Sequence, residues 1–309
     1  MSEGTRSGAL SRVVLAISAF RSEESVVALL KAAFARNAPE FGSVIVVDSL
    51  GSNTLARTIA EHGWPVEYRN ASTNLGSAGN LHLRLELAAT TGLDWCLALN
   101  HDGILDLAKA QLLVECGQSI DRVGAVYPQM RYPRAAGRLD RPRRALGTIG
   151  QLDEVAERAG PVDVAWSSSN GALYRLAAVS AGINAWPELW MGYEDLAIGW
   201  ELQRKGWRQI LCPDVIVDDN YEFRPVVILG RTFYLVDKPV WYCYYQLRNM
   251  ALIARYTRGR ALSWRAVISR SVIDLILLSL RKQRLSRFKL LTLGLWDGLR
   301  GKAGKGPVP

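Results

Sequence analysis

The chain has 309 residues, of which 49% are hydrophobic and 22% are charged, and its formal net charge is +9. This composition excludes disordered and fibrous proteins, and the length suits one large domain or one domain with an appendage. No apolar run reaches the ~20 residues that a membrane-spanning helix needs, and the polar segment 1–12 lacks the apolar stretch of a signal peptide, so we expect neither.

Short apolar runs rich in β-branched residues alternate with helical patterns in the first half of the chain. Strands are predicted at residues 13–18, 43–48, 65–68, 94–99 and 123–127. Helices are predicted at residues 22–36, 55–62 and 107–119, and a further helix opens from the glycine turn 74–80 and runs to residue 89. This alternation indicates an α/β domain with a mostly parallel sheet, whose ligands bind where the strands end.

The second half of the chain is less regular. Residues 128–160 are rich in Arg, Pro and Gly, which predicts a long loop. We then expect strands at 162–166, 171–175 and 208–211, and a helix at 196–205 that is closed by Gly206. Aromatic and basic helical stretches begin near residue 241, so we divide the chain into a domain at 1–225 and a basic, mainly helical region at 226–309.

The basic charge is concentrated near the C-terminus. Residues 241–309 contain 14 Lys or Arg and 2 Asp or Glu, whereas the first 240 residues contain 24 basic and 27 acidic side chains. This asymmetry indicates a polyanionic partner, either a membrane surface or a nucleic acid. Interleaved Trp, Tyr and Leu favour the membrane surface, and no recognition motif supports nucleic-acid binding.

The side chains best suited to hold a cation are carboxylates. The four cysteines form no C-x-x-C pair and there are only three histidines, so we expect reduced thiols in a cytosolic protein and no zinc site. Asp48 and Asp102 follow apolar strands, and Glu194 and Asp195 precede a helix. Carboxylates on one sheet edge repel each other unless a cation compensates them, and Mg²⁺ or Mn²⁺ bridging phosphate oxygens would do so. The structural alternatives are turns at Asp48 and Asp102 and a helix cap at Asp195.

The order of the motifs resembles glycosyltransferase family 2, whose members are inverting enzymes of the GT-A fold. The chain is most similar to the bacterial rhamnosyl- and galactofuranosyltransferases of that family, and the resemblance covers roughly residues 13–220. It is carried by VVLAIS with residues 22–25, VIVVD ending at Asp48 with residues 51–53, NLGSAGN at 74–80, ALNHDG at 98–103, residues 123–125, the turn 169–172, WMGYED at 190–195, and residues 206–207 and 212–214.

The resemblance implies roles for particular side chains. Asp195 would be the general base that deprotonates the acceptor hydroxyl, with Glu194 beside it. Asp102 would ligate the metal, and Asp218 or Asp219, for which we favour Asp219, can replace the late histidine of many members. The expected donor-binding residues are Ser18, Asp48, Asn74, Gly76, Asn80 and Asn100. The expected acceptor-binding residues are Trp190 and Tyr193, for which packing in the core is the alternative.

We therefore expect an inverting glycosyltransferase with a GT-A, Rossmann-like sheet and a basic helical C-terminal region. It would transfer a sugar, with rhamnose the leading candidate, from a dTDP- or UDP-sugar to a hydroxyl of a glycan or lipid-linked glycan in bacterial cell-wall or polysaccharide biosynthesis. Mg²⁺ or Mn²⁺ would assist, and the basic region would hold the enzyme on the inner face of the cell membrane, with no nucleic acid as partner. The alternatives are a catalytically weak sugar- or nucleotide-binding relative and a sugar nucleotidyltransferase.

Overall fold

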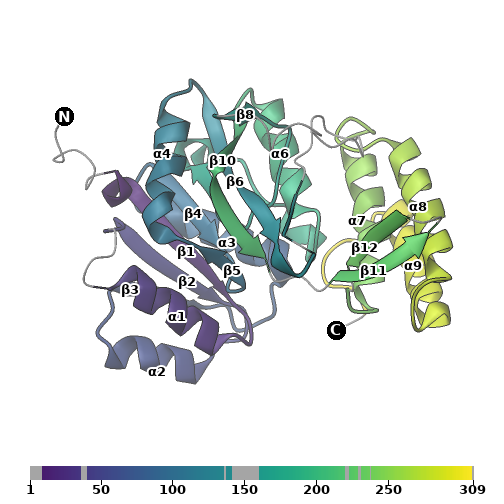
Figure 1. The fold of residues 1–309 in the computed structure, drawn as a ribbon, viewed down its shortest axis with the longest axis horizontal. Coiled ribbons are helices and arrows are strands. Elements are labelled where there is room, and N and C mark those ends of the chain that lie inside the picture. Colours follow the sequence, from purple (N-terminus) through teal and green to yellow (C-terminus); the bar gives the residue numbers. More distant parts are fainter. Residues whose placement is uncertain are drawn as a thin grey trace.

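The computed structural model describes residues 9–35, 40–135, 137–140, 160–219, 223–228, 231–236 and 238–307. A twisted sheet lies between two layers of helices, and three C-terminal helices stand at one end of it (Figure 1). The α/β class expected from the sequence is therefore confirmed.

The sheet is mixed but mostly parallel on the side that carries the N-terminal strands. In spatial order its strands are β3 (Val66–Asn70), β2 (Ser43–Asp48), β1 (Val13–Ala19), β4 (Trp95–Leu99), β9 (Ala172–Arg175), β6 (Val123–Tyr132), β10 (Arg208–Asp219) and β5 (Gly103–Leu105), with β7 (Arg138–Leu139) beside β6 and β8 (Val162–Asp163) beside β10. The first four run parallel, as do β6 and β10, whereas β9 and β5 are antiparallel to their neighbours. The carboxyl ends of β1, β2 and β4 consequently meet at one edge.

Helices cover both faces of this sheet. One face packs against α1 (Glu23–Ala33), α2 (Asn53–Glu61) and α4 (Ala110–Gln118), and the other against α3 (Gly76–Ala89), α5 (Leu176–Ser180) and α6 (Glu194–Arg204). The side chains of β1 alternate between the two cores: Leu15 belongs to the first core and Ala16 to the second. A strand that is buried on both faces has no polar positions, which explains the uninterrupted apolar runs of the sequence.

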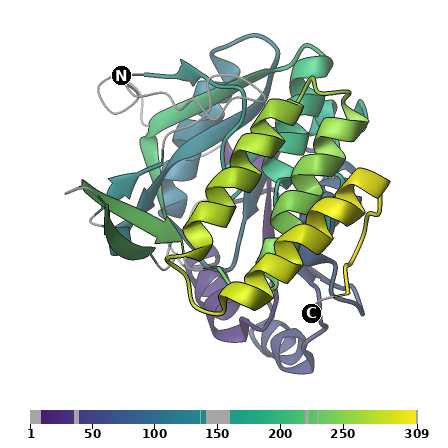
Figure 2. The ribbon, with the colours of Figure 1, turned by 90° about the vertical axis from the view of Figure 1, so that its right-hand side faces the viewer.

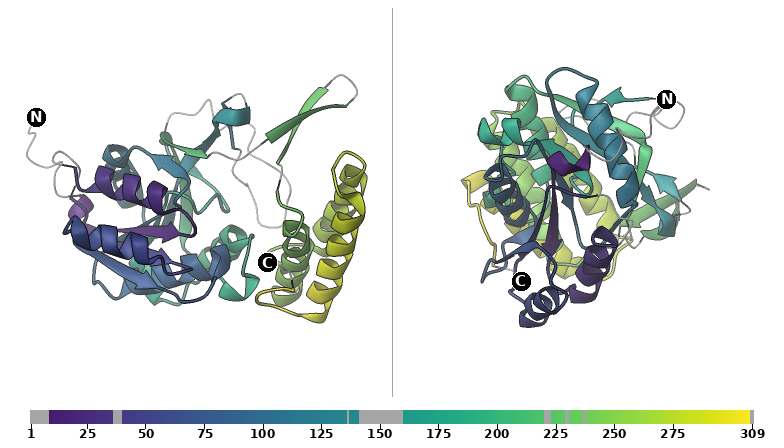
Figure 3. Two further views of the ribbon diagram at one scale, coloured as in Figure 1. Left: turned by 90° about the horizontal axis from the view of Figure 1, so that it is seen from below. Right: turned by 90° about the vertical axis from the view of Figure 1, so that its left-hand side faces the viewer.

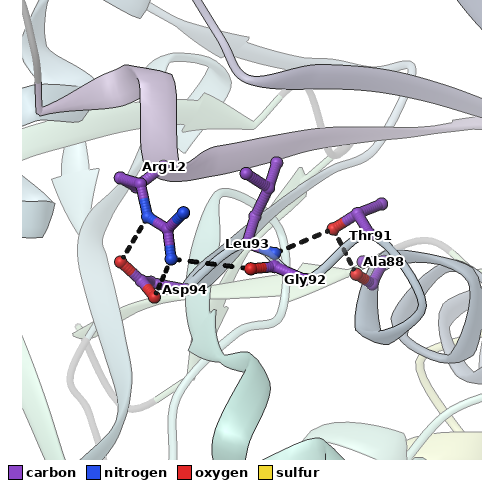
Figure 4. A network of polar contacts seen from close by, with 6 residues as sticks. All are labelled: Arg12, Ala88, Thr91, Gly92, Leu93 and Asp94. Carbon is purple, nitrogen blue, oxygen red and sulfur yellow. Dashed lines mark hydrogen bonds and ion pairs between the residues drawn. The ribbon is translucent and has the colours of Figure 1, made fainter.

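An ion pair joins the segments before β1 and β4 at the edge of the sheet opposite to these carboxyl ends. Arg12, just before β1, donates from Nε and Nη2 to the two carboxylate oxygens of Asp94, at 2.9 and 2.8 Å (Figure 4). Thr91 accepts from the backbone N–H of Leu93 and donates to the carbonyl of Ala88, which shapes the turn after α3. The start of β1 is thereby tied to the start of β4.

The C-terminal helices share a core with the α/β layers. They are α7 (Tyr242–Tyr256), α8 (Trp264–Leu278) and α9 (Arg284–Arg300), and α8 and α9 form the outer surface (Figure 2). Helix α9 packs closely on α7 because Gly294 has no side chain: a Cβ there would overlap the carbonyl of Tyr244. Leu196 and Ala197 of α6 belong to the same apolar cluster as residues of α7, α8 and α9.

Several boundaries differ from those predicted. Strand β6 extends to Tyr132 and β7 follows it, so the loop expected at 128–160 is wrong for those residues, while residues 141–159 lie outside the described part of the chain. Strand β10 continues to Asp219 because a bulge between Cys212 and Ile216 accommodates Pro213. A hairpin of β11 (Phe223–Ile228) and β12 (Arg231–Val236), which was not predicted, spans the proposed boundary at 225 and projects beside the C-terminal helices (Figure 3).

Candidate active site

A cavity of about 550 Å³ lies where β1, β2 and β4 end, and we call it the donor-side cavity. Its lining includes Ser18, Asn74, Gly76, Asn80, Asn100, Asp102 and Trp190 from the residues singled out in the sequence. Arg84, Trp241 and Lys305 also line it. Residues from Ser18 to Lys305, which lie far apart in the sequence, therefore line one cavity.

A buried arginine supports the floor of this cavity. Arg84 of α3 is 2% exposed and donates to the carbonyls of Ala16 and Leu99 and to Oδ1 of Asn100, at 3.0, 3.1 and 3.2 Å. Burial lowers its pKa to about 10, so the guanidinium remains charged at neutral pH. A fixed positive charge beneath the cavity favours an anionic ligand.

The first turn of α3 supplies a second wall. The side-chain amide of Asn80 donates to the carbonyl of Val47 and to Ser49 Oγ, whereas its Oδ1 accepts no hydrogen bond within the described part of the chain. Gly76 has φ +66°, and a Cβ there would overlap the carbonyl of Trp190. Glycine at this position thus permits the chain that carries Trp190 to approach α3.

Asp48 shapes the loop beyond β2. Its carboxylate accepts from the backbone N–H groups of Leu50, Gly51 and Ser52 and from the hydroxyl of Tyr68, at 2.7–3.1 Å. Burial alone would raise the pKa of Asp48, but these donors outweigh burial and hold the pKa below its usual value. The side chain does not line the donor-side cavity, although Ser49 and Leu50 do. Its role in donor binding stays a prediction.

Two consecutive aspartates end β10, and their side chains point to opposite faces of the sheet. Asp219 is paired with Gly103 in the ladder between β10 and β5, one residue beyond Asp102. Asp218 instead forms an ion pair with Arg131, at 2.6 Å, and is thereby engaged elsewhere. Asp219 is therefore the better placed of the two aspartates to act together with Asp102.

The donor set fits a magnesium or manganese ion that is shared with a substrate. Such ions are commonly held by one or two carboxylates together with waters and phosphate oxygens, and Asp102 and Asp219 offer that number. Among the residues that the structure describes, no group of three or more His, Cys, Asp or Glu side chains is arranged to hold a metal ion. Firm binding at Asp102 and Asp219 would therefore need oxygens from a ligand.

A lysine lies among the acidic side chains. Burial lowers the pKa of Lys238, and the negative charges of Asp219, Glu194, Asp102 and Asp195 act against that shift. All four carboxylates are therefore close enough to act on one ammonium group. The predicted metal ligands and the predicted base therefore all interact electrostatically with Lys238, whose positive charge offsets part of the repulsion among them.

The surroundings of Asp195 raise its pKa into the range where a carboxylate exchanges a proton near neutral pH. It lies in the first turn of α6, where its Oδ1 accepts from the backbone N–H of Ser169 at 2.9 Å. Burial and then the charge of Glu194 raise the pKa of Asp195 to about 7. Burial also raises the pKa of Glu194, whose Oε2 has no hydrogen-bond partner in the described residues. A carboxylate with this pKa suits general-base chemistry.

The loop before α6 has an unusual backbone. Trp186, Trp190 and Tyr193 have positive φ angles of 49°, 57° and 69°, in a region that bulky side chains rarely adopt. Each such residue costs on the order of 1–3 kcal/mol, so the surroundings must hold the loop in place.

Two side chains of α7 hold this loop in place through hydrogen bonds to its carbonyl groups. The side-chain amide of Asn249 donates to the carbonyls of Leu189, Met191 and Gly192, at 3.0, 2.8 and 2.9 Å. Arg248 donates to the same Leu189 carbonyl at 2.6 Å, and both side chains are fully buried. The position of Asp195 thus depends on α7, which the sequence analysis assigned to the separate C-terminal region 226–309.

Asp195 lines a second cavity, of about 280 Å³, and not the donor-side cavity; we call this second cavity the acceptor-side cavity. Tyr193 and Asp195 line it together with residues of α7, α8 and α9. Trp190, which was expected on the acceptor side, instead lines the donor-side cavity, where its indole donates to the carbonyl of Asn74 at 3.1 Å. Its contact with an acceptor stays a prediction.

The sequence did not single out several residues that build the site. Arg84 looked like one polar residue of an amphipathic helix, and Lys238 and Lys305 lie in segments without a motif. Arg248 and Asn249 are adjacent polar residues in an otherwise apolar helix, which was the only available signal of their burial.

Comparisons with known proteins identify the fold. No family model matches the chain, and no curated protein matches its sequence. Three solved glycosyltransferase structures are similar. GalNAc-T7 with UDP, GalNAc and Mn²⁺ has a TM-score of 0.56 and 12% identity over 85% of this chain and 57% of that chain. Residues 1–349 of TarS from S. aureus have a TM-score of 0.51 and 13% identity over 93% of this chain and 80% of that chain.

The third structure is the mannosyltransferase PcManGT from Pyrobaculum calidifontis with GDP-Man and Mn²⁺, which gives a TM-score of 0.53 and 12% identity over 93% of this chain and 87% of that one. At these identities the likeness establishes the fold alone. The chain spans slightly more than half the length of GalNAc-T7. The GT-A-like fold expected from the sequence is confirmed.

The contacts of α7 generate a prediction about Asp195. In Asn249→Ala, the carbonyls of Met191 and Gly192 lose the Asn249 donor, whereas the carbonyl of Leu189 keeps Arg248, and we expect the free energy of unfolding in urea to fall by about 1–3 kcal/mol. Water should then reach α6 more easily, so the pKa of Asp195, measured by carboxyl NMR, should fall from about 7 toward its ordinary value.

Thr257→Val provides the matched control, because it removes buried hydrogen bonds at the end of the same helix that do not involve the loop. It should destabilise the fold without changing the pKa of Asp195. An unchanged pKa in Asn249→Ala would show that α7 does not position this carboxylate.

Proposed function

We propose that the chain is an inverting glycosyltransferase that transfers a sugar from a nucleoside diphosphate to a hydroxyl group. The observation that carries this proposal is the placement of Asp195, beside Glu194, in the lining of the acceptor-side cavity, while Trp190 and Met191 of the preceding loop line the donor-side cavity. Two further observations support it: the similar GalNAc-T7 and PcManGT structures hold UDP and GDP-Man, each with Mn²⁺. Membership of family 2 and a rhamnosyl donor rest on the sequence motifs.

In this mechanism the donor occupies the cavity at the ends of β1 and β4. Ser18, Asn100 and Asn80 offer hydrogen-bonding groups to the nucleotide sugar, and Asp102 and Asp219 would hold Mg²⁺ or Mn²⁺. The ion, when bound, neutralises charge on the diphosphate. The buried guanidinium of Arg84 adds positive potential from below.

Asp195 takes the proton from the acceptor hydroxyl. The acceptor oxygen then forms a bond to the anomeric carbon as the bond from that carbon to the diphosphate breaks, and the nucleoside diphosphate leaves with the electron pair. Attack from the face opposite to the leaving group inverts the configuration at this carbon. Glu194 raises the basicity of Asp195 through its nearby charge.

Donor binding should depend on Asp102. We expect a panel of dTDP-, UDP- and GDP-sugars to include one that the chain binds with Mn²⁺ and turns over when acceptor hydroxyls are supplied. In Asp102→Asn, nucleoside diphosphate affinity measured calorimetrically with Mn²⁺ should fall at least tenfold, because one of two carboxylate ligands is lost.

Asp121→Asn, an exposed carboxylate on the α4–β6 turn, is the control for charge and should bind as the wild type does. Equal affinity in Asp102→Asn, or an affinity that does not respond to a chelator in the wild type, would remove Asp102 from metal binding. Nucleotide binding without any transfer would favour a binding protein of the same fold.

The pH dependence tests the base. Asp195 must be deprotonated to accept a proton, so kcat/KM should rise with pH and level off above about 7. Because the charge of Glu194 raises the pKa of Asp195, Glu194→Gln should move this rise to lower pH. Asp195→Asn should abolish transfer and retain nucleotide affinity. Full turnover in Asp195→Asn, or an unshifted profile in Glu194→Gln, contradicts these roles.

The membrane association expected from the sequence is also part of the proposal. The described helices include none with both the length and the apolarity that crossing a bilayer would demand. Apolar side chains are nevertheless exposed along the outer helices, with Ile268 and Ile276 of α8 exposed by 63% and 64% and Leu285 of α9 by 67%. Exposed basic residues flank them (Arg265, Lys282, Arg284, Lys289 and Arg300).

An apolar face bordered by positive charge fits the interface of an anionic membrane. We expect the chain to sediment with vesicles that contain phosphatidylglycerol, and Ile268→Ser/Ile276→Ser to weaken this binding at least tenfold. The control Ile104→Ser/Leu112→Ser removes two exposed apolar side chains from the sheet region instead. The membrane proposal fails if both double variants bind the vesicles as the wild type does.

A further inference from the structure

The segment that follows α9, residues 301–307, carries a lysine into the lining of the donor-side cavity. Lys305 lines this cavity together with Asp102 and the buried Arg84, although it lies far from both in the sequence. The motifs that predicted the donor site all lie within residues 13–220, and the expected donor-binding residues lie between Ser18 and Asn100. Lys305 is therefore a cationic residue of the cavity that no motif accounts for.

Hydrogen bonds fix the backbone directly before Lys305. The N–H group of Gly304 donates to the carbonyl of Glu188 at 2.6 Å, and the carbonyl of Gly304 accepts from the guanidinium group of Arg248. Arg248 is fully buried and also donates to the carbonyl of Leu189. One side chain of α7 thus holds both the segment that carries Lys305 and the loop that precedes Asp195.

The backbone directly after Lys305 is fixed as well. The N–H group of Gly306 donates to the hydroxyl of Tyr245 at 2.9 Å. A Cβ at position 306 would overlap the ring of Tyr244, which is fully buried and has no room to move aside. Glycine therefore lets the segment pack against α7 at this point. With residues 304 and 306 both held, the backbone of Lys305 has a defined place beside the cavity.

The ammonium group of Lys305 has hydrogen-bonding capacity to offer a ligand. It lies over the indole of Trp190, 5.9 Å from the ring centroid, which is near the outer limit of a cation–π contact. In the described part of the chain it forms no ion pair and no hydrogen bond, and the side chain is exposed. An ammonium group has three N–H donors, and its hydrogen bonds to anionic oxygens are the strongest ones that it forms.

We infer that the ammonium group of Lys305 binds the diphosphate of the donor, so that the segment 301–307 forms part of the donor site. This inference rests on the proposed function and adds to it a binding residue from outside the α/β layers. A diphosphate presents several oxygens at once, and an ion held by Asp102 leaves some of them free for an ammonium group. The cavity that Asp102 and Lys305 share has a volume of about 550 Å³, which suits a ligand that reaches both.

Titration calorimetry of the full chain with UDP, GDP and dTDP in the presence of Mn²⁺ tests this role. With the tightest-binding of the three, we expect Lys305→Gln to weaken binding at least fivefold, because a charge-assisted hydrogen bond to phosphate is lost. Lys305→Arg keeps a cation at this position and should bind within threefold of the wild type. The measurement requires neither a sugar donor nor turnover.

Lys302→Gln is the matched control. Lys302 is exposed in the same segment, forms an ion pair with Asp297 at 3.2 Å and does not line the donor-side cavity. The control removes the same charge from the chain and should change the affinity less than twofold. If Lys305 only packs on Trp190, Lys305→Gln would lower the urea midpoint of unfolding and leave nucleotide affinity unchanged. That result overturns the inference.

Labelling of the wild-type chain provides a measurement that does not depend on a variant that folds. Lysines are reductively methylated with and without the tightest-binding nucleoside diphosphate and Mn²⁺, and each site is quantified by mass spectrometry. The bound nucleotide should slow methylation of Lys305 at least threefold and leave the rate at Lys302 unchanged. Equal rates at Lys305 in the two conditions place this lysine outside the donor site.

The results separate this inference from the proposed function. Nucleotide binding that Asp102→Asn weakens but Lys305→Gln leaves unchanged would retain the donor site and remove Lys305 from it. If the wild type binds none of the three nucleoside diphosphates, the proposed donor site and the inference fail together.

Discussion

The loop before α6 adopts a backbone that its own residues disfavour, and two buried side chains of α7 hold it there. Asn249 donates to three of its carbonyls and Arg248 to one of them. This loop delivers Glu194 and Asp195 to the edge of the sheet where β1 and β4 end. The C-terminal helices therefore border the candidate site, and an apolar cluster joins them to α6.

Burial of the acidic pair gives the site its chemistry. Burial raises the pKa of both Glu194 and Asp195, and the charge of Glu194 raises the pKa of Asp195 further, to about 7, so Asp195 can exchange a proton near neutral pH. The positive charge of Lys238 limits this cost. The two cavities differ in their lining: the donor-side cavity is lined by amides, a hydroxyl and a buried arginine, whereas the acceptor-side cavity is lined by Tyr193, Asp195 and side chains of the C-terminal helices. Under the proposed function, the donor would occupy the first cavity and the acceptor the second.

The sequence predicted the architecture because buried strands and amphipathic helices have strong periodic patterns. The residues at the strand ends, such as Ser18, Asn100 and Asp102, could be brought together on topology alone. Three features could not be predicted from the sequence. Strand β10 continues past Pro213 through a bulge, the hairpin after it has no alternating pattern, and the contacts of Asn249 are long-range. Asp48 illustrates the limit of motif reasoning, since the same residue type in the same place can shape a turn as well as bind a ligand.

The central claim is that one enclosure at the ends of β1 and β4 holds a nucleoside diphosphate beside Asp102 and within reach of the acceptor attacking at Asp195. A crystal structure of the chain grown with Mn²⁺ and the tightest-binding nucleoside diphosphate tests it most directly. The account predicts the diphosphate next to Asp102, with the nucleotide between Ser18 and the first turn of α3. A nucleotide bound in the acceptor-side cavity, with the cavity at the strand ends filled only by water, would contradict it.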